Sequence, residues 1–190
     1  MFVVRRSKNN PIISPIREHP FENFSTFNGS PVEVGRKIHL LYRAQSLPET
    51  FENNRLSVSV IGKAESSDGV RFGDRKQFIF PENVWERYGL EDPRVTKIGG
   101  KYFIFYTALS TFPFSGDGIK VGLAISPDMK TISEKHLVTP FNAKAMCLFP
   151  EKINGKFTAM LSVNTDRPPS RIALAEFNKL SDIWDEKYWK

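Results

Sequence analysis

The stretch IGGKYFIFYTA at residues 98–108 has two counterparts in the same chain, VGRKIHLLYRA at 34–44 and INGKFTAMLSV at 153–163. The three stretches align without gaps. Each begins with an aliphatic residue, continues with glycine within the next two positions and then a lysine, and ends as a run of strand-forming residues. The three lysines are 64 and 55 residues apart. Recurrence of one pattern at such an interval predicts a repeat architecture.

Each stretch is predicted to be the turn and the second strand of a β-hairpin. Tight hairpin turns need positive φ, which glycine adopts at little cost, and the turns contain Gly35, Gly99–Gly100 and Asn154–Gly155. A proline precedes each marked lysine by six to eight residues and is expected near the start of the incoming strand. A further strand is expected after each hairpin, at residues 56–62, 119–126 and 171–177.

Each unit therefore holds three or four short antiparallel strands, and the chain has no convincing helical periodicity. Radial repetition of four-stranded units is the pattern of a β-propeller. A β-sandwich is the alternative, because it also consists of short strands and turns. The threefold recurrence favours an all-β propeller. We expect residues 1–190 to form a single, partial domain with about three blades, since propellers usually have 4–8.

Composition narrows the function classes. The 190 residues include 40% hydrophobic and 25% charged residues, as in globular domains. The formal charge is +6, but the 27 basic and 21 acidic residues are interspersed, so we predict no nucleic-acid partner. The single cysteine excludes an internal disulfide and a cysteine-rich zinc site. The three histidines show no metal spacing, and we predict neither a metal nor a cofactor.

Hydropathy argues against a membrane protein. No segment approaches the ~18 apolar residues of a membrane span, and the N-terminus MFVVRRSKNN lacks the apolar core of a secretory signal. We therefore predict no membrane partner and a cytoplasmic location.

The repeats also predict where a site should lie. Loops that enter the innermost strand of each blade converge on one face, so polar residues at the same point of successive repeats should meet near the axis. Those points are FNGSP at 27–31, LEDPR at 90–94 and LFPEK at 148–152. They predict that Asn28, Glu91, Asp92 and Glu151 surround one pocket.

Two residues near this pocket have alternative interpretations. An acid near an arginine and aromatic walls can be tuned for proton transfer. On local sequence alone, however, Asp92 could belong to a charged turn in which Arg94 pairs with a surface acid. Arg43 ends the first marked strand. It either points into the channel to bind hydroxyls or an anion, or extends to solvent.

The motifs FNGSP, LLYRA, SSDGVRF, GLEDPRVTKIGGKYFIFYTA and LFPEKINGKF together resemble glycoside hydrolase family 130. The resemblance extends from about Asn10 to the C-terminus, and its EDPR and FPEKINGK stretches are the most specific parts. The family comprises β-mannoside phosphorylases and β-mannosidases on five-bladed propellers. About three of five blades would then be present in this chain.

The resemblance implies that Asp92 is the general acid. In the family the acid protonates the mannosyl O3 hydroxyl, which relays a proton to the glycosidic oxygen. Phosphate or water then attacks the anomeric carbon from the opposite face, with inversion. Asn28 and Arg43 match positions that hold the sugar, and Glu91 and Arg94 flank the acid as predicted substrate-binding residues. For hydrolysis, the repeats suggest Glu151 as the second carboxylate.

The sequence departs from the family in the residues that bind phosphate. The phosphorylases usually carry a His-Arg pair after FPEKINGK, where this chain has Ser162-Val163. Lys144 and Arg167 are the remaining predicted phosphate ligands. The balance therefore favours a glycosidase that uses water on an oligosaccharide. The alternatives are a phosphorylase with inorganic phosphate as co-substrate, and a truncated, non-catalytic carbohydrate-binding fragment. Homo-oligomerisation is compatible with all three.

Overall fold

The computed structural model describes residues 3, 5–166 and 168–190. Within these residues the regular structure consists of β-strands and three short 3-10 helices, which confirms the predicted all-β class. The strands are β1 (Ser25–Val34), β2 (Lys37–Gln45), β3 (Glu49–Phe51), β4 (Asn54–Leu56), β5 (Ser59–Ser66), β6 (Gly73–Ile79), β7 (Leu90–Ile98), β8 (Lys101–Leu109), β9 (Ile119–Ser126), β10 (Glu134–Leu137), β11 (Ala143–Leu148), β12 (Phe157–Val163) and β13 (Arg171–Phe177). The 3-10 helices are η1 (Val84–Glu86), η2 (Gly116–Gly118) and η3 (Leu180–Trp184).

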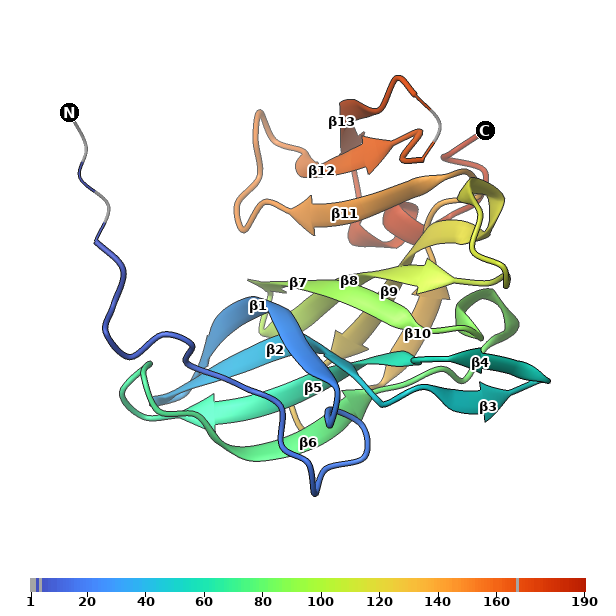
Figure 1. The fold of residues 1–190 in the computed structure, drawn as a ribbon. Helices are drawn as coiled ribbons and strands as arrows, with labels where there is room; N and C mark the ends of the chain where they lie inside the picture. Colours follow the sequence, from blue (N-terminus) through green and yellow to red (C-terminus); the bar gives the residue numbers. More distant parts are fainter. Residues whose placement is uncertain (1–2, 4, 167) are drawn as a thin grey trace.

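The strands form three larger antiparallel sheets, one for each predicted repeat. The first sheet has the order β1-β2-β5-β6, the second β7-β8-β9-β10 and the third β11-β12-β13. Strands β3 and β4 form a separate hairpin in the connection between β2 and β5. The sheets stack with the second in the middle (Figure 1). Sequential sheets of this kind, each starting at an inner strand, are the arrangement of a β-propeller.

The predicted turns are present. Strand partners Val34 and Lys37 enclose Gly35, which has φ of 63°, and the turn after β7 contains Gly99 and Gly100 with φ of 56° and 82°. In the third repeat Asn154 and Gly155 have φ of 51° and 81°. These left-handed conformations explain why glycine or asparagine recurs before each marked lysine.

The second sheet is covered by apolar side chains on both faces, because residues of a strand point alternately to opposite sides. Ile104 and Tyr106 of β8 pack in one cluster with Leu41 and Ile61 of the first sheet. Phe105, one position along, faces the third sheet. A middle sheet covered on both faces contradicts the two-sheet β-sandwich alternative.

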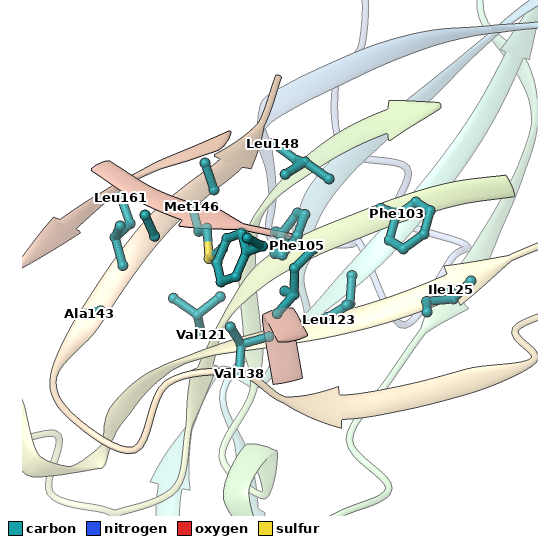
Figure 2. Packing of buried hydrophobic residues seen from close by; sticks show 14 residues of the cluster. Phe103, Phe105, Val121, Leu123, Ile125, Val138, Ala143, Met146, Leu148 and Leu161 are labelled. Atoms are coloured by element: carbon teal, nitrogen blue, oxygen red, sulfur yellow. The ribbon is translucent and has the colours of Figure 1, made fainter. Parts of the chain in front are cut away.

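The cluster between the second and third sheets is the larger one. Figure 2 shows Phe103 and Phe105 of β8 and Leu123 of β9 against Met146 and Leu161 of the third sheet. Each fully buried aliphatic or aromatic side chain contributes roughly 1.5–3 kcal/mol to folding. The apolar contacts therefore fix the angle between neighbouring sheets, and with it the position of their inner strands.

The inner strands β1, β7 and β11 lie side by side. Val95 of β7 donates its backbone N–H to the Ser30 hydroxyl of β1 at 3.1 Å. On the other side, the Thr96 hydroxyl donates to the backbone carbonyl of Leu148 in β11 at 2.8 Å. Side chains on these three strands can therefore meet although they are far apart in the sequence.

Candidate active site

Each inner strand contains a β-bulge at the same point. The pairing register shifts between Phe27 and Ser30, between Glu91 and Arg94, and between Lys144 and Cys147. The bulges place Asn28, Asp92 and Ala145 in the left-handed region, with φ of 52°, 53° and 53°. A bulge redirects side chains, and non-glycine residues in this region cost about 1–2 kcal/mol each. Such strain commonly marks functional sites.

The first two bulges bring predicted site residues into contact. Asn28 donates from Nδ2 to Oδ1 of Asp92 at 2.6 Å, across the boundary between the first and second sheets. Arg43 of β2 forms an ion pair with Glu91, and its Nη1 lies 3.7 Å from Asp92 Oδ1. The guanidinium carbon lies 4.7 Å from the centre of the Phe27 ring. Asn28, Arg43, Glu91 and Asp92 thus form one cluster. It contains three of the four residues that the repeat predicted to meet, without Glu151, and Arg43 points into it rather than to solvent.

The cluster is partly withdrawn from water. The side chains of Arg43, Glu91 and Asp92 are 17%, 19% and 24% exposed. Burial raises the pKa of Glu91 above its ordinary value, and the neighbouring charge of Asp92 acts in the same direction. Arg43 and Lys144 oppose this shift of the Glu91 pKa. Two adjacent carboxyls that share one arginine in such a setting can hold and transfer a proton.

Lys144 of β11 is near enough to this cluster for its charge to act on Glu91. It directly precedes the left-handed residue of β11, the position that Glu91 occupies in β7 and Phe27 in β1. Its charge acts on Glu91, and its Nζ lies 4.0 Å from the Asp166 carboxylate. Ser162 is its direct strand partner in β12, so the pair that replaces the expected His-Arg begins opposite this lysine.

Arg94, Glu151 and Arg167 are placed differently. Arg94 is half-buried, and its Nη1 donates to the Pro93 carbonyl at 3.3 Å. Glu151 is exposed in the connection after β11, and no hydrogen bond or ion pair within the described residues joins it to the cluster. It lies six positions beyond Ala145, which is about 20 Å of extended chain. Arg167 lies outside the described residues.

The position of Glu151 follows from the length of the third hairpin. The left-handed residues Asn28 and Asp92 each precede their marked lysine by nine residues, whereas Ala145 precedes Lys156 by eleven. The alignment of the prolines therefore matched Glu151 to the wrong part of the repeat. The prolines also depart from the prediction. Pro31 and Pro93 lie within β1 and β7 rather than at their starts.

Two further residues, Phe27 and Ser59, contribute to the cluster and belong to none of the predicted site residues. Phe27, which lies against the guanidinium of Arg43, was visible only as the neighbour of Asn28. Ser59 accepts a hydrogen bond from Arg43 Nε at 3.0 Å, and only the register between β2 and β5 reveals that contact.

A cavity of about 610 Å³ adjoins the cluster. Its walls include Phe27 and Asn28 together with Pro11, Ile12 and Ile13 from the N-terminal segment. In the described part of the chain, no His, Cys, Asp and Glu side chains gather in a group that could hold a metal ion. None of its helices has the length and apolar character to cross a membrane.

The sequence matches one glycoside hydrolase family over almost its whole length. The sequence profile of glycoside hydrolase family 130, described as beta-1,4-mannooligosaccharide phosphorylase, matches residues 3–184. A beta-1,2-mannobiose phosphorylase of Thermoanaerobacter sp. (strain X514) is 37% identical over 164 residues, covering 83% of this chain and 53% of that protein. A 1,2-beta-oligomannan phosphorylase of the same organism is 32% identical over 161 residues, covering 84% and 53%.

Solved structures of similar fold include two carbohydrate-active enzymes. A beta-1,2-mannobiose phosphorylase from Listeria innocua, in complex with beta-1,2-mannobiose, matches with a TM-score of 0.78 and 26% identity over 92% of this chain and 63% of that one. A glycosyl hydrolase from Bacteroides ovatus matches in fold, with a TM-score of 0.72 and 23% identity over 93% and 55%. The chain spans about half the length of the curated relatives it matches.

Proposed function

The chain belongs to glycoside hydrolase family 130, and from this membership we propose that it carries the general acid of an enzyme that cleaves β-mannosides by phosphorolysis. The observation that carries the proposal is the contact between Asn28 and Asp92 at 2.6 Å, made by left-handed residues of two successive repeats. Bulges of this kind are frequent next to active sites, where they redirect a side chain.

In the proposed reaction Asp92 supplies the proton. The bond between the mannosyl anomeric carbon and the glycosidic oxygen breaks, and a bond from a phosphate oxygen to that carbon forms on the opposite face. The leaving oxygen receives the proton through the sugar O3 hydroxyl, as the family resemblance implies. The products are mannose 1-phosphate with inverted configuration and the shortened sugar. Asn28 and Arg43 hold the mannosyl unit so that this relay is aligned.

Phosphate is proposed as the nucleophile in preference to water, which the sequence alone had favoured. The curated relatives are named as phosphorylases. Lys144, whose charge acts on Glu91, has an ammonium group that suits a phosphate dianion. Arg94 and Arg167 stay proposed ligands on sequence grounds alone.

Hydrolysis is the second candidate, and Ser162-Val163 in place of the His-Arg pair is the observation that favours it. An inverting hydrolase needs a second carboxylate roughly 6.5–9.5 Å from the acid to activate water. Glu151 was the sequence candidate for this role, and its exposed position in the third hairpin lends it little support. Phosphate needs no such base, which is a further reason to prefer phosphorolysis.

The test is incubation of the protein with β-1,2- and β-1,4-mannobiose, with and without inorganic phosphate. Mannose 1-phosphate formed only when phosphate is present supports the proposal. Free mannose released at equal rates under both conditions contradicts phosphorolysis and favours hydrolysis. Binding of mannobiose without either product would instead support the non-catalytic alternative.

A further inference from the structure

The contacts behind Arg43 assign a role to a residue that no motif identifies, and this inference rests on the proposed function of the Asp92 site. We propose that Ser59 is a positioning residue that fixes the guanidinium of Arg43 against the carboxylates of the second sheet. Ser59 does not touch those carboxylates. It acts through the arginine, from the buried first position of β5.

Three hydrogen bonds hold this arrangement. The Ser59 hydroxyl oxygen accepts from Arg43 Nε at 3.0 Å and from Gln45 Nε2 at 3.1 Å. The carbonyl oxygen of the same glutamine accepts from the Ser25 hydroxyl at 2.8 Å. That bond assigns the amide nitrogen of Gln45 to the side facing Ser59. The serine oxygen therefore accepts two hydrogen bonds and is itself held in place.

The guanidinium is thereby held on three sides. Ser59 binds the Nε edge, Glu91 and Asp92 face the two terminal nitrogens, and the Phe27 ring covers one face. The guanidinium is planar and rigid, so fixing one edge sets the direction of the other. Without a partner at Nε, the long side chain regains rotamers that point its terminal nitrogens away from the carboxylates.

The backbone ties Ser59 to the same sheet boundary. Ser59 forms a parallel bridge with Gly89, which has φ of 134° and lies two residues before Glu91. A β-carbon at Gly89 would lie 3.2 Å from both the backbone nitrogen and the carbonyl oxygen of Ser59. The absence of a side chain at this glycine allows the start of β7 to approach β5. The bridge between Ser59 and Gly89 therefore positions both the serine that binds Arg43 and the strand that carries Glu91 and Asp92.

The charged groups that face Glu91 predict what loss of the anchor would do. They are Arg43 from β2, Asp92 from its own strand and Lys144 from β11. Burial and Asp92 raise the pKa of Glu91, and the two cations lower it. If Arg43 turns away, the nearer of these cations is lost, and the pKa of Glu91 must rise.

The experiment is a carbon-detected NMR titration of the Glu91 carboxyl in the wild type, in Ser59→Ala and in a matched control, Ser66→Ala. Ser66 stands at the other end of β5 and is similarly buried, with 4% exposure against 2% for Ser59. Its hydroxyl bonds backbone N–H groups of the following turn rather than the site. Both variants lose a buried hydroxyl, so both should lower the free energy of unfolding.

Of these two variants, Ser59→Ala should raise the Glu91 midpoint by about 0.5 or more, because it releases an opposite charge within ~4–6 Å, and Ser66→Ala should leave it unchanged. Gln45→Ala should shift it in the same direction and by less, and this variant carries the test if Ser59→Ala does not fold. A Glu91 midpoint within about 0.2 of wild type in folded Ser59→Ala or Gln45→Ala would overturn the proposal. The titration needs no turnover, so a failed mannobiose assay would count against the proposed function and not against this role.

Discussion

Replacing Arg43 by methionine should destabilise the protein much more at pH 7 than at pH 4. The arginine side chain is 17% exposed and its partner Glu91 is 19% exposed, so most of both groups is removed from water. Methionine retains much of the apolar stem and removes only the charge and its hydrogen bonds. The change therefore isolates the electrostatic part of the contact between the first two sheets.

The expected size follows from the pairing. Removing one partner of a fully buried ion pair costs about 3–5 kcal/mol, because the remaining charge is left desolvated. The residual exposure of both groups reduces this to about 2–3 kcal/mol at pH 7. At pH 4, loss of the hydrogen bond to Ser59 and of the contact with the Phe27 ring leaves about 1 kcal/mol.

The direction of the pH dependence follows from Glu91. Its pKa in the folded protein is raised above the ordinary 4.5, mainly by burial. A raised carboxyl pKa gives a stabilising contribution that is complete below 4.5 and is lost as the pH rises through the folded pKa. Without the opposing charge of Arg43 the folded pKa rises further. The free energy of unfolding that is lost between pH 4.5 and 7 is therefore larger in Arg43→Met than in the wild type.

The measurement is urea unfolding of the wild type, Arg43→Met and Arg43→Lys at pH 4 and pH 7. Arg43→Lys keeps the positive charge and loses the planar fork, so its destabilisation should be intermediate at pH 7 and nearly independent of pH. An equal destabilisation of Arg43→Met at both pH values would refute the reasoning, because it would mean that Glu91 does not depend on the arginine.

Two further outcomes test the phosphate ligand and the stacking of the sheets. Lys144→Met should raise the KM for inorganic phosphate about 10-fold or more, as expected for loss of a charge-assisted hydrogen bond. The control Lys152→Met, at an exposed position, should leave this KM unchanged. An unchanged phosphate KM of Lys144→Met in steady-state kinetics would exclude Lys144 as a ligand. Phe105→Ala removes a fully buried ring between the second and third sheets and should lower the free energy of unfolding by about 3–5 kcal/mol in urea titration; a cost below about 1 kcal/mol would show that these sheets do not pack against each other.

Much of the fold could be predicted because each repeat contains a glycine that marks its hairpin turn. Tight turns need a residue with positive φ, which glycine adopts most easily. Gly35, Gly99 and Gly155 each have the predicted left-handed conformation. The β3–β4 hairpin was not predicted, because an insertion between strands follows no repeat. The face that each residue of β8 presents to its neighbours follows from strand alternation once the stacking is known.

The site was predictable to the extent that it repeats. Asn28 and Asp92 stand at equal distances before their lysines, so their convergence could be expected before their contact was seen. The third repeat has a longer hairpin, and there the alignment of the prolines selected Glu151 instead of the position beside Lys144. Ser59 could not be found from the sequence, because its role depends on the register of β5 against β2 and on one hydroxyl direction.

The central claim, that Asp92 is the acid of a β-mannoside-cleaving site, is tested most directly by the rate of mannobiose cleavage in the presence of inorganic phosphate by the wild type and by Asp92→Asn. The asparagine keeps the shape of the side chain and cannot supply the proton. A loss of more than about 10²-fold in rate is predicted, the usual size of general acid catalysis. Near-wild-type cleavage by Asp92→Asn would contradict the account.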